Sequence, residues 1–499
     1  MSGLGLQWHR VDRHVATDDF LHGKDAGRRL RRIMITPRRK LTRGARGMVL
    51  LVCLGLCMSA AALAQGQPPP DAGSAPAPRV GNPPLRALFG SSETDPELTR
   101  GVDITGSVFE VYDQNLLAEA GMQAPSRLLE RRGAYTNLLG DVRYERRGSR
   151  LQLGGTGGAS ARYYPGISEF LATDYHAGFG VSARTTPLTT VAVNQAFSYS
   201  PIFLLGLFVT GQEPRLGDPR QSVTDFAVTD DRSVTTSTSA DVERRLSDRS
   251  LAIASGSYRR SHYLVENPNG TDFTTLDGGG VYRYLLSNDH DLELGYTYRR
   301  ARYSGEGLFG PRPEPNEHIV NAGFSYHPTL TESRPTVVTF DVGTAIVHAP
   351  VPTDVFRLTR QVRVVGEATV LHQVGRTWLL EGAFKRGTAF VEGLGAPVFV
   401  DAVTATANGF LNRRTDMLLS LSYSSGEPSL VGAITTFSTT SVNARVRFAL
   451  SSRWAVTSEY LFYHYDFSKI PDLLPGLNPR VQRNSVRAGV SLWLPAFRP

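Results

Sequence analysis

The segment Ser485-Val-Arg-Ala-Gly-Val-Ser-Leu-Trp-Leu494, close to the end of a 499-residue chain, alternates aliphatic side chains with small or charged ones. Val486, Val490 and Leu494 fall on one face of an extended strand, and Arg487 falls on the other. Successive side chains of a strand point to opposite faces, so a period of two predicts a strand with one apolar and one polar face.

The same alternation returns along most of the chain from Val102 onward. It is seen in Asp174 to Arg184, in Leu292 to Arg299 and in Ile434 to Phe448. One uninterrupted apolar run, Met48 to Leu63, is too short and too near the start to be a membrane-spanning helix. Strands that show lipid only with every second side chain cross a membrane at a modest hydrophobic content, here 41%. We therefore expect an all-β fold.

Short and long connections alternate between these predicted strands, which is typical of an antiparallel up-and-down β-barrel in an outer membrane. We expect one barrel over residues 101–497 with about eighteen strands and both ends on the periplasmic side; sixteen strands is the alternative. The predicted short turns are Arg147 to Ser149, Thr186-Pro187, Ser247-Asp248, Ser287 to Asp289, Pro328 to Pro335, Val374-Gly375, Asn412 to Arg414 and Ser451-Ser452, and the predicted long loops include 200–232, 304–317, 348–355 and 466–482.

Aromatic residues near the predicted strand ends suggest two girdles at the level of the lipid headgroups, where amphipathic rings are favoured. Ordinary strand aromatics of a soluble sandwich are the alternative. The predicted girdle residues are Trp378, Trp454 and Trp493 on the short-turn side and Tyr199, Tyr303, Tyr463 and Tyr465 on the long-loop side.

The N-terminal 64 residues have the features of a signal peptide with a long basic first region. A basic stretch ending at Arg46 precedes the apolar run, and Ala62-Leu-Ala64 supplies small residues for cleavage near Ala64. Met34 is a second candidate translation start. Residues 65–100 are rich in proline and are expected to form a disordered periplasmic spacer, with a proline-rich docking ligand as the alternative.

The net charge of +8 comes entirely from the start of the chain. Residues 1–47 hold 12 of the 54 Lys and Arg and 4 of the 46 Asp and Glu, which leaves 42 of each sign. A neutral mature chain does not attract phosphate over a distance, so we expect no nucleic-acid partner. Both cysteines, Cys53 and Cys57, would leave with the signal, so no disulfide or thiolate metal site is expected.

Charged residues on the faces opposite the apolar ones are candidates to line the lumen. Mixed signs there would tune ion or solute selectivity, or would pair across strands and stiffen the wall. The pore-lining candidates are Arg184, Asp241, Glu243, Glu293, Arg299, Arg363, Glu367, Glu381, Lys385, Arg445, Arg447 and Arg487.

The apolar run Pro201 to Val209 in the longest loop suggests an inward constriction or a contact with the outer leaflet, and a longer strand is the alternative. His176 with Asp174, and His464 with Asp466, are the nearest candidates for an acid/base pair, because side chains two apart share a strand face. The chain lacks the G-x-S-x-G and H-E-x-x-H motifs. We therefore expect no enzyme, no catalytic residues, no cofactor and no metal.

The segment Val102-Asp-Ile-Thr-Gly-Ser-Val-Phe-Glu-Val-Tyr-Asp-Gln-Asn-Leu116 resembles the opening strand of bacterial outer-membrane porin-like β-barrel families, in which an aromatic-Asp-x-Asn-Leu sequence leaves the membrane. The resemblance implies a channel-like barrel that is sometimes connected with export of surface polysaccharide. Such barrels usually end on an aromatic residue, whereas Phe497 is followed here by Arg498-Pro499, which bears on recognition by the barrel assembly machinery.

The expected function is a passive or weakly selective outer-membrane channel for small solutes or ions. A structural or polysaccharide-export accessory barrel is the alternative, and an outer-membrane enzyme is the least favoured interpretation. The expected partners are outer-membrane lipid and lipopolysaccharide, with the barrel assembly machinery acting during biogenesis.

Overall fold

The computed structural model describes part of the chain, all of it within the compact unit Ala75–Pro499. Within the described part, no helix has the length and apolar character that crossing a membrane requires. The predicted signal peptide and the predicted loop constriction at 201–209 lie outside the described residues, apart from Pro201. The described residues are 89, 100–115, 133–165, 170–201, 232–264, 272–304, 306–307, 310–311, 314–327, 336–349, 360–390, 397–428, 436–466 and 480–497.

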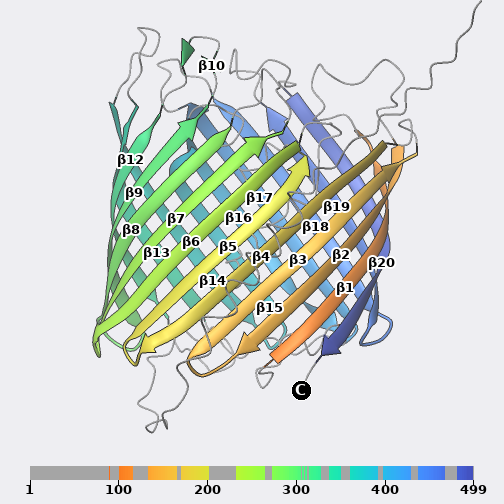
Figure 1. Cartoon of the computed structure of the whole chain (residues 1–499), viewed down its shortest axis with the longest axis horizontal. Helices are drawn as coiled ribbons and strands as arrows, with labels where there is room; N and C mark the ends of the chain where they lie inside the picture. The colour runs from red at the N-terminus through yellow and green to blue at the C-terminus, as the bar shows by residue number, and fades with distance from the viewer. Residues whose placement is uncertain are drawn as a thin grey trace, which may run out of the picture. The chain divides into compact units, whose positions relative to one another are not determined.

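Eighteen strands form a single sheet, and they run at a tilt to the axis of the ring (Figure 1). Two further strands of two residues each, β10 (Glu306–Gly307) and β11 (Gly310–Pro311), pair only with each other. The long strands are β1 (Arg100–Asp113), β2 (Gly133–Arg147), β3 (Leu151–Tyr164), β4 (Phe170–Thr186), β5 (Thr189–Pro201), β6 (Arg232–Ser247), β7 (Ser250–Tyr263), β8 (Phe273–Leu285), β9 (His290–Tyr303), β12 (Asn316–Tyr326), β13 (Thr336–His348), β14 (Arg360–Val374), β15 (Trp378–Phe390), β16 (Pro397–Asn412), β17 (Thr415–Pro428), β18 (Phe437–Ala449), β19 (Trp454–Asp466) and β20 (Arg480–Phe497).

Each long strand pairs antiparallel with the next one along the chain, and β20 pairs back onto β1. The register of this last pair runs from Val102 opposite Phe497 to Asp113 opposite Ser485. The sheet is therefore a closed up-and-down barrel, and the prediction of eighteen rather than sixteen strands is confirmed. Seven of the eight predicted short turns fall between consecutive strands at one rim, where β1 begins and β20 ends, and the eighth, Pro328 to Pro335, lies outside the described residues.

The two faces of the wall have opposite character, as the alternation predicts. Large apolar side chains stay exposed on the outer face: Val108 is 51% exposed, Leu294 59% and Val364 64%. Cross-strand register keeps them together, since Val108 lies opposite Leu138 on β2 and opposite Val490 on β20. An outer surface of this kind suits lipid, whereas a soluble protein would bury it.

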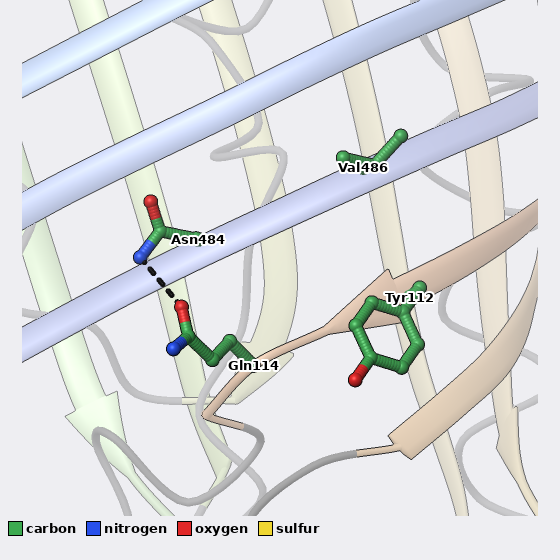
Figure 2. A pocket seen from close by; sticks show the side chains of 4 residues that line it. All are labelled: Tyr112, Gln114, Asn484 and Val486. Atoms are coloured by element: carbon green, nitrogen blue, oxygen red, sulfur yellow. Dashed lines mark hydrogen bonds between the residues drawn. The ribbon is translucent and has the colours of Figure 1, made fainter.

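The seam between the first and last strands carries a shallow depression on the outer face near the long-loop rim (Figure 2). Tyr112 and Val486 are half exposed beside it. Gln114 and Asn484 are joined beside it by two hydrogen bonds. The Gln114 backbone N–H donates to the Asn484 backbone carbonyl at 2.9 Å, and Asn484 Nδ2 donates to Gln114 Oε1 at 2.9 Å. Polar side chains thus continue the β1–β20 pairing beyond the end of the strand.

An ion pair joins the same seam on the inner face. Asp113 is fully buried, and its carboxylate accepts a hydrogen bond of 2.5 Å from Arg483 Nε on β20. Arg483 Nη1 also donates to the Tyr463 hydroxyl at 3.1 Å, and Asn115 Nδ2 donates to the Gln482 carbonyl at 3.0 Å. The Asp113 and Asn115 positions of the porin-like motif therefore serve barrel closure, and we call the Asp113–Arg483 pair the seam clasp.

Candidate functional site

The register places all twelve pore-lining candidates on the inner face of the wall. On β18, for example, Arg445 and Arg447 alternate with outward-facing Val446, and on β20 Arg487 alternates with Val486. At least seven of the twelve candidates are in ion pairs. These pairs are Glu293 with Arg283, Arg299 with Asp277 and Glu317, Arg363 with Glu427, Glu367 with Lys385, Arg447 with Asp416, and Arg487 with Glu459.

The acidic partners of three of these arginines are not among the candidates that the sequence pattern identifies. Asp277, Asp416 and Glu459 occupy inward positions of β8, β17 and β19, each directly opposite its arginine on the neighbouring strand. The alternation of each strand could have found their face. Which arginine each carboxylate meets depends on the strand register, which the sequence pattern alone does not fix.

One hairpin separates from the wall on one side and bends inward. The pairing of β14 with β15 stops at Gly366 opposite Arg386, although the pairing of β15 with β16 continues to Phe390 opposite Pro397. The tip of this hairpin comprises residues 387–390 and 397–400. Residues 387–390 therefore have no partner on β14, whereas residues 398–400 stay paired with β17, from Val398 opposite Pro428 to Val400 opposite Gly426. We call this tip the inward hairpin.

The inward hairpin packs against the inner faces of strands that lie earlier in the ring. Phe399 is 4% exposed and is clustered with Ala345, Val365 and Ile319, which are inner-face residues of β13, β14 and β12. Phe390 packs onto a second cluster built around Tyr303 of β9. These contacts show that the hairpin covers part of the inner wall and narrows the lumen on that side.

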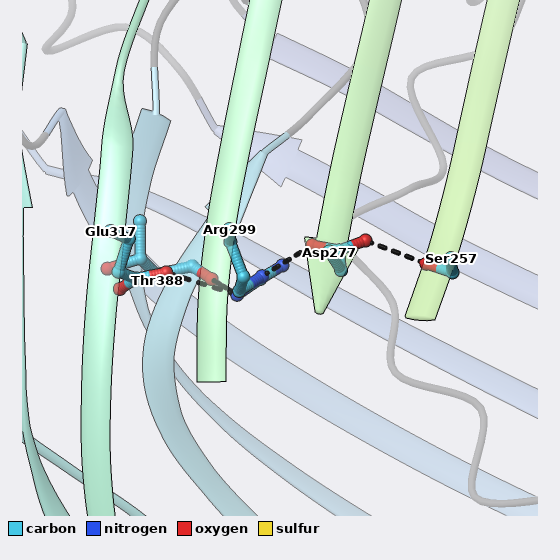
Figure 3. A network of polar contacts seen from close by, with 5 residues as sticks. All are labelled: Ser257, Asp277, Arg299, Glu317 and Thr388. Carbon is cyan, nitrogen blue, oxygen red and sulfur yellow. Dashed lines mark hydrogen bonds and ion pairs between the residues drawn. The ribbon is translucent and has the colours of Figure 1, made fainter. Parts of the chain in front are cut away.

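A polar network holds the inward hairpin in place (Figure 3). Arg299 Nη1 of β9 donates to the backbone carbonyl of Thr388 at 3.0 Å. The same guanidinium contacts Asp277 at 3.2 Å and Glu317 at 3.3 Å, and it lies 4.9 Å from the centre of the Phe390 ring. We call Arg299, Asp277, Glu317 and Thr388 the hairpin latch.

Two further features strengthen the hairpin latch. Glu317 is fully buried, so its charge depends on the nearby guanidinium for compensation. Ser257 Oγ donates to the second oxygen of Asp277 at 2.9 Å, which fixes that carboxylate from the β7 side. The network therefore spans β7, β8, β9, β12 and the hairpin.

An ion pair spans the place where the hairpin has separated from β14. Arg363 Nη2 of β14 lies 2.6 Å from Glu427 Oε1 of β17, although β15 and β16 separate these strands in the ring. The Arg363 guanidinium also lies 4.9 Å from the centre of the Phe399 ring. Because Glu427 is the register partner of Phe399, this contact fastens the tip of the inward hairpin to β14.

The predicted aromatic girdle divides into two groups. Trp378 and Trp454 face outward, as does Tyr199, whose ring lies 5.8 Å from that of Tyr175. The expectation is corrected for the other four, which point inward and are buried: Trp493, Tyr303, Tyr463 and Tyr465. The pleat decides the face, because Trp493 stands between Leu492 and Leu494 and each of the three tyrosines likewise occupies an inward position of its strand.

The inward-facing Trp493 packs against Phe89, a residue of the predicted spacer. Phe89 is 8% exposed and clusters with Trp493, Ala449 and Ala455 on the inner face near the short-turn rim. The Arg447 guanidinium lies 5.0 Å from the centre of its ring. The chain just before the barrel therefore has one aromatic anchor inside the wall.

The histidine candidates do not form the pairs considered from sequence. His176 Nε2 lies 3.1 Å from Asp141 on β2, across the intervening strand β3, while Asp174 accepts a hydrogen bond from Ser160. The contact needs Gly158 of β3, because a Cβ there would lie 2.5 Å from His176 Cε1. His464 faces outward beside Thr440. Gly158 therefore serves the packing of the wall between Asp141 and His176.

No protein-family model matches this chain, and no curated protein matches it in sequence. Solved structures with a similar course include OccAB4 of Acinetobacter baumannii (8% identity, TM-score 0.40, covering 80% of this chain and 100% of that one). OpdL of Pseudomonas aeruginosa gives 8% identity and a TM-score of 0.40, covering 80% of this chain and 99% of that one. The ferric-catecholate import receptor Fiu of E. coli K12 gives 7% and 0.40, covering 79% and 81%. Likenesses this distant carry no argument about function. The function of this chain is therefore inferred from the residues on the two faces of its barrel wall.

Proposed function

We propose that this chain is an outer-membrane channel for small hydrophilic solutes or ions, narrowed by the inward hairpin. The observation that carries the proposal is the closed ring of eighteen strands with an apolar outer face and a charged inner face. Barrels of about 16–18 strands are wide enough to leave an aqueous passage. A lumen lined by both signs of charge favours hydrated solutes over apolar ones.

The same features support the proposed location. An outer face of exposed valine, leucine, phenylalanine and tyrosine is suited to acyl chains, and the export signal predicted for residues 1–64 leads to the periplasm. Lipid and lipopolysaccharide are then the surroundings of the folded barrel, and the barrel assembly machinery inserts it.

A structural or export-accessory barrel is the second candidate function. It is favoured by the pairing of seven of the twelve inner-face candidates, because ion pairs between strands stiffen a wall without contributing to transport. One experiment distinguishes a barrel that passes solutes from a barrel that is only structural.

Conductance of the purified, refolded chain in planar lipid bilayers tests the proposal. A channel gives discrete current steps, and liposomes that contain the protein swell in small sugars at a rate that falls with solute size. Chain that is left unfolded in urea before addition is the matched control. A folded barrel, established by β-type circular dichroism, that gives neither steps nor swelling would exclude the channel and favour the structural alternative.

A further inference from the structure

The inner faces of β17 to β20 carry three arginines and two carboxylates that adjoin one another in register. Arg445 and Arg447 share the inner face of β18, with Arg447 opposite Asp416 of β17 and Arg445 opposite Glu459 of β19. Glu459 is in turn opposite Arg487 of β20. We call these five residues the arginine cluster, and its side chains carry one positive charge in excess.

Both carboxylates of the arginine cluster are already occupied. Arg447 Nε donates to Asp416 Oδ2 at 2.8 Å, and Arg487 Nη2 lies 2.6 Å from Glu459 Oε2. The other Glu459 oxygen accepts a hydrogen bond of 2.9 Å from Asn443 Nδ2. The Asp416 side chain is 7% exposed and that of Glu459 is 5% exposed, so neither carboxylate is free to turn toward another cation.

Arg445 is the cation left over. Among the residues that the structure describes, it makes no hydrogen bond and no ion pair, and its neighbour on the β17 side is the apolar Leu418. Its Nε is buried without a partner, and so is the Nε of Arg487 on the far side of Glu459. A buried donor without an acceptor is costly, so an incoming acceptor would be favoured here.

Aromatic rings restrict the planes of the two neighbouring guanidinium groups. Arg487 lies 5.3 Å from the centre of the Phe109 ring, and Arg447 lies 5.0 Å from that of Phe89. A guanidinium fixed in this way presents parallel N–H groups that match the two oxygens of a carboxylate or phosphate.

We propose that Arg445 and Arg487 form an oxyanion-binding site in the lumen, which takes the carboxylate or phosphate group of a small solute. The site rests on the proposed channel function, and it makes the arginine cluster the place where an anionic solute pauses in transit. Among the described residues of the hairpin latch, Arg299 is not open to a ligand in this way, because two carboxylates and a backbone carbonyl hold it.

The test compares Arg445→Gln with Arg184→Gln, which removes the same charge from the inner face of β4, far from the cluster. Inorganic phosphate and acetate are the two probes, and their binding to the detergent-solubilised full chain is measured by titration calorimetry, which does not depend on conductance. Loss of the charged hydrogen bonds in Arg445→Gln is expected to weaken binding of each probe by about tenfold. Arg184→Gln is expected to bind as the unchanged chain does.

Block of single-channel chloride current by the same probes gives a second readout. Phosphate is expected to block the unchanged chain and Arg184→Gln alike, and to block Arg445→Gln only at higher concentration. Arg445→Lys, which keeps the charge and loses the planar fork, should fall between. Equal binding in Arg445→Gln and the unchanged chain, or an equal loss in Arg184→Gln, overturns the site. If the unchanged chain gives no current but Arg445→Gln still binds the probes about tenfold more weakly than the unchanged chain, the proposed channel is overturned and the proposed binding site is retained.

Discussion

The hairpin latch and the arginine cluster are built from the same chemical groups and reach opposite outcomes. In the latch, one arginine serves two carboxylates and a carbonyl, so the acceptors outnumber the cation and Arg299 is fixed from three sides. In the cluster, three arginines share two carboxylates, so one cation has no acidic partner. Six strands separate β9 from β18 in the ring. The ratio of acceptors to donors therefore decides whether an inner-wall network fastens a segment or remains open to a ligand.

The largest expected effect follows from removing what the latch holds. Arg386 and Asp401 are partners in register with their charged groups 3.5 Å apart, so an Asn-Gly turn between them can replace residues 387–400. Single-channel conductance is expected to rise severalfold, because the hairpin no longer covers the inner wall. Unchanged conductance in a variant that keeps its β-type circular dichroism would show that the hairpin lies clear of the solute path.

A smaller effect is expected when the hairpin stays and the latch is removed. Arg299→Ala leaves the buried Glu317 without its cation and frees the Thr388 carbonyl, which should lower the free energy of unfolding by about 1–3 kcal/mol. Open-channel current should become noisier as the hairpin moves. Arg299→Lys keeps the charge and serves as the matched control, with an intermediate loss measured by thermal unfolding. A current as quiet as that of the unchanged chain would contradict the role given to the latch.

The smallest effect separates two arginines within the cluster itself. Arg447→Gln removes the partner of Asp416, a side chain that is 7% exposed, and should cost about 1–3 kcal/mol of unfolding free energy. Arg445→Gln removes a cation without a partner and should change that free energy by less than about 0.5 kcal/mol. Urea unfolding of the two variants measures the difference. Equal losses would mean that Arg445 is held by the wall after all.

The alternation of side chains was enough to predict the barrel, because each strand meets two different surroundings on its two faces. Arg445 and Arg487 could be placed on the inner face for that reason. Trp493 and Tyr303 could not be placed from their nearness to a strand end, since the pleat decides the face. The inward hairpin was out of reach as well, because residues 387–390 lose their pairing with β14 while residues 398–400 keep theirs with β17, and strand register is not written in the side-chain pattern.

The seam clasp has a consequence for how this chain matures. Asp113 and Arg483 are separated by 370 positions in sequence, yet they form a buried ion pair between the first and last long strands. A chain interrupted anywhere between them can pair strands one after another, yet it lacks this contact between its first and last strands. The clasp thus couples closure of the ring to synthesis of the last strand.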